Sequence, residues 1–222
     1  MHQFFVEKSQ VGKEYVTITG SDVNHIRNVL RMKIGETIRI SDREGGNYFC
    51  KIAETGENFV QADIVSVDEE GTELPSKIYL FQALPKGDRM ETVIEKAVEL
   101  GVYEIIPVAM KYCVVKLEEK KAAQRVQKWQ AQAETAAKQS KRSIIPKIHE
   151  VVSFKEALKL AENCDIRLVP YENENGMEGT RTVLEQIEPG KSISIMIGPE
   201  GGFAEEEIAK ARETMQSISL GR

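Results

Sequence analysis

The sequence predicts an α/β protein in which a small β-barrel precedes a larger domain built on a parallel sheet. Residues 1–70 contain short runs rich in β-branched and aromatic side chains, separated by turn residues. From residue 77 onward, apolar strand patterns alternate with amphipathic helix patterns, which is typical of a parallel sheet. Between these two regions, acidic residues, glycine and proline interrupt the strand and helix patterns at 67–76. We therefore expect a barrel at 1–70, a linker at 71–76 and an α/β domain at 77–222.

The first region combines short strand patterns with a single helix pattern. Residues 43–47 contain a Gly-Gly pair and have the composition of a hairpin loop. The helix pattern covers residues 22–32. The strands are expected at 15–19, 37–41, 48–52 and 60–67.

The second region begins its helices with recognisable capping patterns. Asp88 and Glu91 form the acidic variant of a capping box, and Met90, Ile94 and Val98 follow on one apolar face until Gly101 ends the helix. Residues 153–156 cap another helix in the same way. The strands are expected at 78–84, 104–108, 166–171, 192–197 and 217–220.

The most informative segment is the glycine loop at 198–202. A buried strand pattern runs directly into Gly-Pro-Glu-Gly-Gly, and an amphipathic helix follows at once. Open α/β sheets bind their ligands at the carboxyl ends of their strands, which is where this loop lies. Gly201 and Gly202 can adopt positive φ and let a ligand approach the backbone, so a side chain at either should clash or be strained. An ordinary strand-to-helix turn is the alternative.

The charge of this segment restricts the ligand. The loop contains no Lys or Arg, and Glu205, Glu206 and Glu207 follow it. These carboxylates would repel a phosphate that the helix amino terminus could otherwise attract. The segment is neither a P-loop nor a dinucleotide fingerprint, which disfavours a nicotinamide-dependent oxidoreductase. The pocket should suit a neutral or cationic ligand.

The composition excludes several classes of protein. The three cysteines are far apart and form no C-x-x-C motif, which favours a reducing cytoplasm, and the histidines show no metal-ligand spacing. No apolar run approaches the roughly 20 residues that span a bilayer. We therefore expect a cytoplasmic protein with no metal and no membrane segment.

Basic residues concentrate at a few places although the net charge is −5. The helix pattern at 120–142 has an apolar seam around Trp129 and a polar face rich in Lys and Arg, which include Lys138 and Arg142. Such a face can steer a polyanion such as RNA, and the alternative is a solvated helix. Arg27 and Arg31 are four residues apart and should share a helix face, where either RNA phosphates or carboxylates elsewhere would balance them.

Lys86 and Arg89 add cations at the sheet edge that carries the glycine loop. They follow the strand at 78–84, so they should lie at its carboxyl end. Cations and a ligand loop on one edge suggest an active site.

Taken together, these segments resemble the ribosomal RNA small-subunit methyltransferase E family. Its members are 16S rRNA uracil-N3 methyltransferases of the SPOUT (trefoil-knot) superfamily. The resemblance is carried by Asn-His-Ile-Arg-Asn-Val-Leu-Arg at 24–31, Lys-Gly-Asp-Arg-Met-Glu at 86–91, Glu-Lys-Ala-Val-Glu-Leu-Gly at 95–101, the helix from Trp129 to Arg142, Ile-Gly-Pro-Glu-Gly-Gly-Phe at 197–203 and Leu-Gly-Arg at 220–222.

The resemblance implies a PUA-like β-barrel followed by a knotted, SPOUT-type parallel-sheet domain. It also implies a homodimer that uses S-adenosylmethionine to methylate position 3 of a uridine in 16S rRNA, free or within the small ribosomal subunit. The cofactor-binding residues that it implies are Leu168, Val169, Pro170, Gly198, Pro199, Glu200, Gly201, Gly202, Leu220 and Gly221. The expected RNA-binding residues are Arg27, Arg31, Lys86, Arg89, Lys138 and Arg142.

The uracil N3–H must lose its proton during methyl transfer, so the site needs a base or cations that stabilise the developing anion. Arg89 and Arg222 are the candidates for anion stabilisation. Glu200 either positions the ligand or complements the dipole of the following helix. Members of the family continue past this Leu-Gly-Arg, so we expect a missing segment after Arg222. The alternatives are a ribose 2′-O RNA methyltransferase and a non-enzymatic RNA-binding assembly factor.

Overall fold

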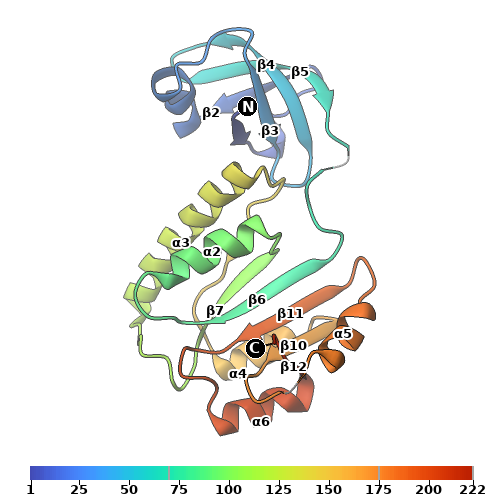
Figure 1. Cartoon of the computed structure of the whole chain (residues 1–222). Helices are drawn as coiled ribbons and strands as arrows, with labels where there is room; N and C mark the ends of the chain where they lie inside the picture. Colours follow the sequence, from blue (N-terminus) through green and yellow to red (C-terminus); the bar gives the residue numbers. More distant parts are fainter. Residues whose placement is uncertain (70, 175, 222) are drawn as a thin grey trace. The chain divides into compact units, whose positions relative to one another are not determined.

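The computed structural model describes residues 1–69, 71–174 and 176–221. The chain forms two compact units. The first comprises Met1–Glu73 with Thr135–Ile145, and the second comprises Leu74–Glu134 with Pro146–Arg222. Each unit contains its own sheet (Figure 1).

The first unit is a curled, five-stranded sheet whose strand order is β1-β3-β4-β5-β2. Strand β1 pairs in parallel with β3, and the other pairs are antiparallel. Side chains that alternate toward the inside, such as Val16, Ile18, Ile38 and Ile40, are completely buried. The strands are β1 (Gln3–Phe5), β2 (Tyr15–Thr19), β3 (Thr37–Ser41), β4 (Asn47–Thr55) and β5 (Phe59–Val67), with a short helical turn η1 (Lys8–Gln10) after β1.

The helix predicted at residues 22–32 is shorter in the structure. It consists of α1 (Ser21–Asn24) and a π-helical turn, η2 (His25–Val29), closed by a 2.8 Å bond from Leu30 N to His25 O. Arg31 lies beyond the helix with a φ of +52°. Arg27 and Arg31 therefore do not share a helix face, and this prediction is wrong. Leu30 and Met32 pack against the core of the sheet, and this packing overrides the helical spacing.

The second unit is built on a parallel sheet with the strand order β12-β10-β11-β6-β7-β8, and β9 also pairs with β7. Every pairing in this sheet is parallel. Parallel strands require crossover connections, which here are mostly helices. The strands are β6 (Lys77–Ala83), β7 (Glu104–Ala109), β8 (Lys147–Ile148), β9 (Val152–Ser153), β10 (Ile166–Pro170), β11 (Ser192–Ile197) and β12 (Gln216–Ile218).

The helices are α2 (Arg89–Glu99), α3 (Glu119–Ser140), α4 (Phe154–Ala161), α5 (Glu178–Glu185) and α6 (Glu205–Thr214). Helix α2 buries the predicted apolar face, and Gly101 follows it with a φ of +97°. The capping box at Ser153 is confirmed. The box at Asp88 is not, because Asp88 makes no side-chain cap bond and its backbone is not extended.

The predicted fold class, a parallel α/β domain preceded by a small β domain, is confirmed. The apolar seam of α3 is also confirmed, since Trp129, Ala133 and Ala136 are buried. Within the described ranges, no helix is both long and apolar enough to cross a membrane.

Candidate functional site

The glycine loop follows β11 at the carboxyl edge of the parallel sheet. It closes through a 2.9 Å bond from Gly202 N to Pro199 O, and Gly202 has a φ of +75°, which an L side chain rarely adopts. A β-carbon at Gly198 would lie 2.8 Å from Cε2 of Phe203, so the bare backbone is needed there too. The conformational requirement that the sequence predicts for Gly202 is confirmed.

Gly201 behaves differently from the prediction. Its φ is not in the left-handed region, and the nearest atom to an added β-carbon would be Cβ of Tyr112 at 3.7 Å, an ordinary contact. The expectation that Gly201 adopts a positive φ is therefore wrong, and an added β-carbon there meets no close contact among the described residues. The two adjacent glycines differ because only Gly202 has a positive φ.

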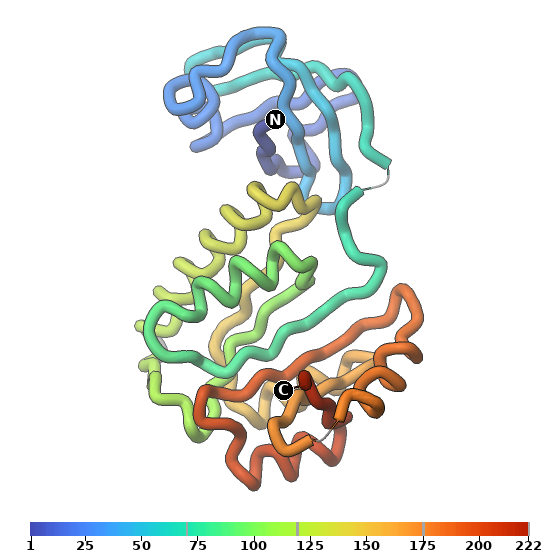
Figure 2. The backbone as a smooth tube through the Cα atoms, in the orientation of Figure 1, coloured from blue at the N-terminus to red at the C-terminus, as the bar shows by residue number. Residues whose placement is uncertain are grey.

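A cavity of about 600 Å³ opens beside this loop, within the second unit. Its walls come from the ends of β10 and β11, from the segment before α5, and from the segment that follows β12. Thr180 holds this last segment through two bonds, from its Oγ1 to Ser219 O at 2.9 Å and from Ser219 N to its Oγ1 at 3.0 Å. Figure 2 shows the segment after β12 running beside the start of α5. Segments distant in sequence thus enclose one pocket.

Several residues expected from the sequence line this cavity, and others do not. Leu168 and Val169 are 2% and 0% exposed within β10 and do not line it. Glu200 and Gly201 are also absent from the wall, and Arg222 lies outside the described residues. The expected residues that do line the cavity are Pro170, Gly198, Pro199, Gly202, Leu220 and Gly221.

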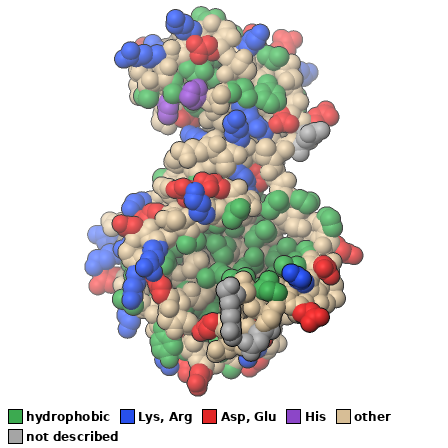
Figure 3. Space-filling model, in the orientation of Figure 1, with side chains coloured by type: hydrophobic (Ala, Val, Ile, Leu, Met, Phe, Trp, Pro, Cys, Tyr) green, Lys and Arg blue, Asp and Glu red, His purple; other side chains and the backbone are tan. Residues whose placement is uncertain are grey.

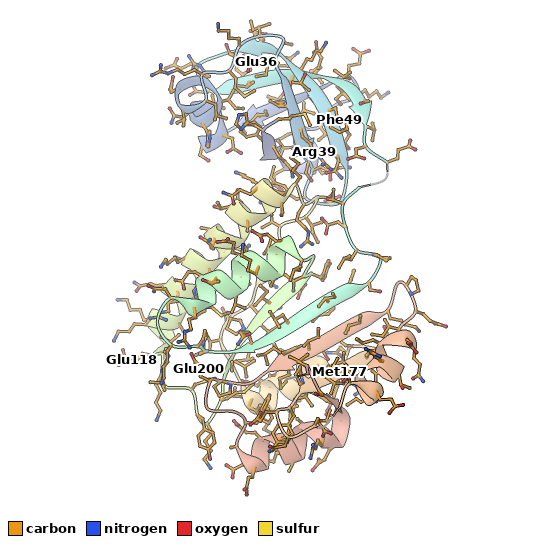
Figure 4. All side chains as sticks on the ribbon, in the orientation of Figure 1. Glu36, Arg39, Phe49, Glu118, Met177 and Glu200 are labelled. Atoms are coloured by element: carbon orange, nitrogen blue, oxygen red, sulfur yellow. The ribbon has the colours of Figure 1, made fainter. Side chains whose placement is uncertain are left out.

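Other residues that line the cavity were not predicted from the sequence. Glu174 and Met177 lie in an irregular segment before α5, where no periodic pattern marks them. Phe203 directly follows the Gly-Gly pair, and this position next to a ligand loop is the sequence feature that could have identified it as a lining residue. Figure 4 labels Met177 beside α5, and an added β-carbon at Gly221 would lie 3.5 Å from its Sδ.

The cavity is acidic. Glu172 and Glu174 line it, and no Lys or Arg is among the described lining residues. Glu174 forms an ion pair with Arg212, whose guanidinium also lies 5.0 Å from the ring centre of Tyr171. Glu172 lies over the backbone of Gly202, since an added β-carbon there would be 2.6 Å from its Oε1. This charge favours a cationic ligand over a phosphate.

Glu200 joins the glycine loop to the neighbouring loop after β6. Its Oε1 accepts a 3.0 Å bond from Lys86 N and a 2.8 Å bond from Nη1 of Arg89. The Lys86 N–H, and to a lesser degree the Arg89 guanidinium, lower the pKa of Glu200. In Figure 4, Glu200 lies toward the connection into α2. The exposed Arg89 guanidinium is thus fixed at the sheet edge that carries the cavity.

Two of the three carboxylates at 205–207, those of Glu206 and Glu207, also hold loops in place. Nζ of Lys111 pairs with Glu206 at 2.9 Å, and Lys111 N donates a 2.9 Å bond to Oε1 of the buried Glu207. Glu207 also accepts from Ala204 N at 3.2 Å. The start of α6 is therefore tied to the loop after β7, and both loops belong to the same sheet edge.

Arg142 is not exposed on the basic face of α3, as the sequence suggests. Its side chain is 4% exposed, and its guanidinium binds the carboxylate of Glu73, with Nε 2.9 Å from Oε2. Glu73 also accepts bonds from Ser143 N at 2.6 Å and Ile144 N at 3.2 Å. A charge run in a sequence does not reveal such a distant carboxylate. We therefore assign Arg142 a structural role.

The remaining basic residues have mixed surroundings. Lys138 pairs with Asp22 at 3.3 Å, and Lys128 pairs with Glu91 at 2.9 Å. Arg27 is exposed and donates a 3.1 Å bond to Glu57 O. Lys86 is exposed at the sheet edge. Only part of the predicted basic face is thus available to an external anion.

A parallel sheet with a ligand cavity at the carboxyl ends of its strands defines the second unit as a ligand-binding domain of the α/β class. Comparison with known proteins defines it further. Residues 72–222 match the RNA methyltransferase domain family, and residues 18–65 match the RNA methyltransferase PUA domain family.

Two proteins similar to this chain carry the same name. The chain is 34% identical to the ribosomal RNA small subunit methyltransferase E of Bacillus subtilis (strain 168), over 96% of this chain and 86% of that protein. It is 31% identical to a Neisseria gonorrhoeae protein of the same name, solved bound to S-adenosyl methionine, with a TM-score of 0.82 over 100% of this chain and 90% of that chain. A putative methyltransferase from Legionella pneumophila, solved with the bound cofactor, is 28% identical with a TM-score of 0.83 over 99% of this chain and 89% of that chain. The chain belongs to the ribosomal RNA small subunit methyltransferase E family.

Proposed function

We propose that the protein transfers a methyl group from S-adenosylmethionine to the ring nitrogen at position 3 of a uridine in 16S rRNA. The observation that carries the proposal is the acidic cavity beside the glycine loop, which lacks Lys and Arg among its described lining residues. S-adenosylmethionine supplies an electrophilic methyl group on a positively charged sulfonium. The carboxylate of Glu172 complements that charge, whereas Glu174 is already paired with Arg212, and relatives at about 30% identity bind the same cofactor.

Different parts of the cavity wall fit different parts of this cofactor. Gly198 leaves room for the Phe203 ring and Gly202 leaves room for the Glu172 carboxylate, and all four residues line the cavity. Phe203, Met177 and Leu220 offer apolar surface for the adenosine part. Both kinds of wall fit a ligand that is apolar at one end and charged at the other.

Arg89 is the residue that we assign to the acceptor base. The uracil N3–H must lose its proton before nitrogen can attack, and negative charge then spreads over the ring oxygens. A fixed guanidinium stabilises that charge without reorganising during the reaction. Glu200 holds Arg89 in place, so we infer a positioning role for Glu200. Lys86, from the same loop, is assigned to an RNA phosphate, and Arg222 remains a second candidate for anion stabilisation.

The first unit is assigned to RNA binding. Arg27, Arg31 and Lys138 are its proposed contacts, and the match of residues 18–65 to a PUA domain supports this assignment. A substrate in the small ribosomal subunit implies action in the cytoplasm.

We also infer that the active protein is a homodimer. Ile78 and Leu80 of β6 lie beside Ile193 and Ile195 of β11 on one face of the sheet, and all but Ile193 remain partly exposed. Figure 3 shows apolar side chains gathered in a hollow on the second unit. An apolar patch of this kind favours a protein interface, and a two-fold dimer is the commonest arrangement.

Calorimetric titration with S-adenosylmethionine tests the cofactor assignment. We expect saturable binding with one site per chain and no binding of NAD under the same conditions. A protein that binds RNA but not S-adenosylmethionine would instead be an RNA-binding assembly factor. A protein that methylates a ribose 2′-oxygen would overturn the proposed acceptor atom.

A further inference from the structure

A second cavity, of about 540 Å³, lies entirely within the first unit. It is formed by the amino-terminal residues, by the helix at 21–29, and by the last turn of α3 with the residue that follows. Its lining includes Phe4, Asp22, His25, Lys138, Gln139 and Lys141. None of these residues lines the cavity at the sheet edge of the second unit.

Lys141 occupies a backbone position that suits glycine. It directly follows α3 and has a φ of +58°, and Arg142 N closes the helix end with a 2.9 Å bond to Ala137 O. Helices commonly end on a left-handed glycine because a β-carbon is disfavoured there. Thr72 Oγ1 holds the carbonyl of Lys141 through a 2.9 Å bond. A lysine at such a position costs stability, and strain of this kind often accompanies a functional side chain.

The charge of Lys141 is not balanced within the cavity. Asp22 is the carboxylate that lines it, and this carboxylate is engaged by Nζ of Lys138 at 3.3 Å. Across the part of the chain that the structure describes, no carboxylate forms an ion pair with Lys141. The cavity therefore presents a cation to an incoming ligand.

An aromatic surface lies in the same cavity. The ring of His25 is exposed, and it meets the buried ring of Phe4 edge-on, with ring centres 6.3 Å apart and planes at 82°. Phe4 thus supports His25 from the core. The histidines seen on this face in Figure 3 lie beside apolar atoms of the first unit. The exposed amide of Gln139 adds a donor and an acceptor.

We propose that this cavity binds one unstacked nucleotide of a single-stranded RNA segment, with its base against His25 and its phosphate at Lys141. An aromatic surface, a cation and an amide around one pocket are the groups that recognise a splayed-out nucleotide. The inference rests on the proposed function for the class of its ligand, RNA, and adds a nucleotide pocket separate from the methyl-transfer site.

The test is RNA binding by the intact protein without cofactor. The probe is a fluorescein-labelled oligouridine of about twelve nucleotides, a length within the range that single-strand-binding folds cover, and the readout is fluorescence anisotropy at several salt concentrations. Lys141→Gly should weaken binding at least threefold and reduce the salt slope by about 0.7, the value for one lost phosphate contact on a single strand. Its Tm should be equal to or above that of the wild type, because glycine relieves the positive φ.

Arg43→Gly is the matched control. Arg43 is also a cation with positive φ, +64°, in the first unit, but it belongs to the β3–β4 loop and does not line the cavity. This variant removes the same charge and relieves the same strain. It should bind RNA with wild-type affinity and salt slope. Equal losses in both variants, or no loss in Lys141→Gly, would overturn the proposal.

Substitutions at His25 test the base-binding half. His25→Ala should weaken binding at least threefold with no change in salt slope, whereas His25→Phe should retain binding because an aromatic face remains. Wild-type affinity in His25→Ala would overturn this half of the proposal. These RNA-binding results can be separated from the proposed function. The affinity of the intact protein for S-adenosylmethionine is measured independently, and it reports on the cavity of the second unit. A wild-type protein that does not bind S-adenosylmethionine would refute the methyl-transfer proposal, and the RNA-binding measurements would still decide the nucleotide pocket.

Discussion

Arg89 begins α2, which follows β6, and Glu200 lies in the loop after the neighbouring strand β11; Nη1 of Arg89 is 2.8 Å from Oε1 of Glu200. The same carboxylate oxygen accepts the backbone N–H of Lys86. This arrangement fastens the glycine loop to the start of α2. It places the proposed anion-stabilising cation next to the loop that forms one wall of the cofactor cavity.

The two adjacent glycines of the loop should respond differently to alanine. Gly202 lines the cavity and has a φ of +75°. Alanine disfavours this φ, so Gly202→Ala should shift the loop to another conformation, and cofactor binding would then have to restore the original one at a cost in free energy. An added β-carbon at Gly201 would make only an ordinary 3.7 Å contact with Cβ of Tyr112, so Gly201→Ala should be tolerated. Calorimetry should show S-adenosylmethionine affinity reduced roughly five- to tenfold in Gly202→Ala, from a strain of about 1 kcal/mol, and little changed in Gly201→Ala. Equal affinities would exclude this loop from the site.

The Glu200 carboxyl should titrate below the ordinary value of 4.5, because the Lys86 N–H and then Arg89 lower its pKa. A pKa depressed in the folded state contributes stability above the unfolded pKa, and this contribution disappears as pH falls through the folded pKa. Carbon-detected NMR should therefore find Glu200 ionised just below pH 4.5. Arg89→Ala should raise its pKa only partly, since the Lys86 bond remains. An unshifted pKa in the wild type would contradict the bonding described here.

The buried pair of Arg142 and Glu73 should be important for the stability of the first unit. Arg142→Ala leaves a largely buried carboxylate without its cation, which should lower the free energy of unfolding by roughly 3 kcal/mol. Lys128→Ala is the control, because the Lys128 side chain is 67% exposed and its pair with Glu91 should contribute less than about 1 kcal/mol. Urea denaturation measures both. If both variants lost less than about 1 kcal/mol of unfolding free energy, Arg142 would again be a candidate for RNA contact.

The apolar sheet face predicts the oligomeric state. Leu80→Gln should convert the proposed dimer to a monomer at micromolar concentration, as measured by light scattering after size exclusion. Leu160→Gln is the control, because Leu160 is 41% exposed beside Tyr79 and Phe81, whose side chains point to the opposite face. A wild-type protein that is already monomeric would refute the dimer.

Much of the fold could be predicted from local patterns. Strands β2, β3 and β11 begin and end where the alternation of side chains and the turn residues predicted. Strand β1 was missed because only Gln3–Phe5 pair, too few residues to show alternation. The π-helical turn was missed because packing of Leu30 and Met32, not helical periodicity, decides where that helix ends.

The site was predictable only where a local rule applied. Gly202 could be identified because glycine at positive φ has a sequence signature. The bond between Arg142 and Glu73 joins residues 69 positions apart, which no spacing rule detects. Met177 lines the cavity beside the segment after β12, which Thr180 holds against α5, and these contacts depend on tertiary structure alone.

Methyl transfer itself tests the central claim most directly. Purified protein is incubated with methyl-labelled S-adenosylmethionine and 16S rRNA, free or in small subunits from cells that lack the enzyme, and the modified nucleoside is identified by mass spectrometry. We predict N3-methyluridine at one position, with the rate reduced about 100-fold or more in Arg89→Ala while cofactor affinity is retained. A 2′-O-methylated ribose, or no labelled nucleoside from a protein that binds both the cofactor and the rRNA, would contradict the account.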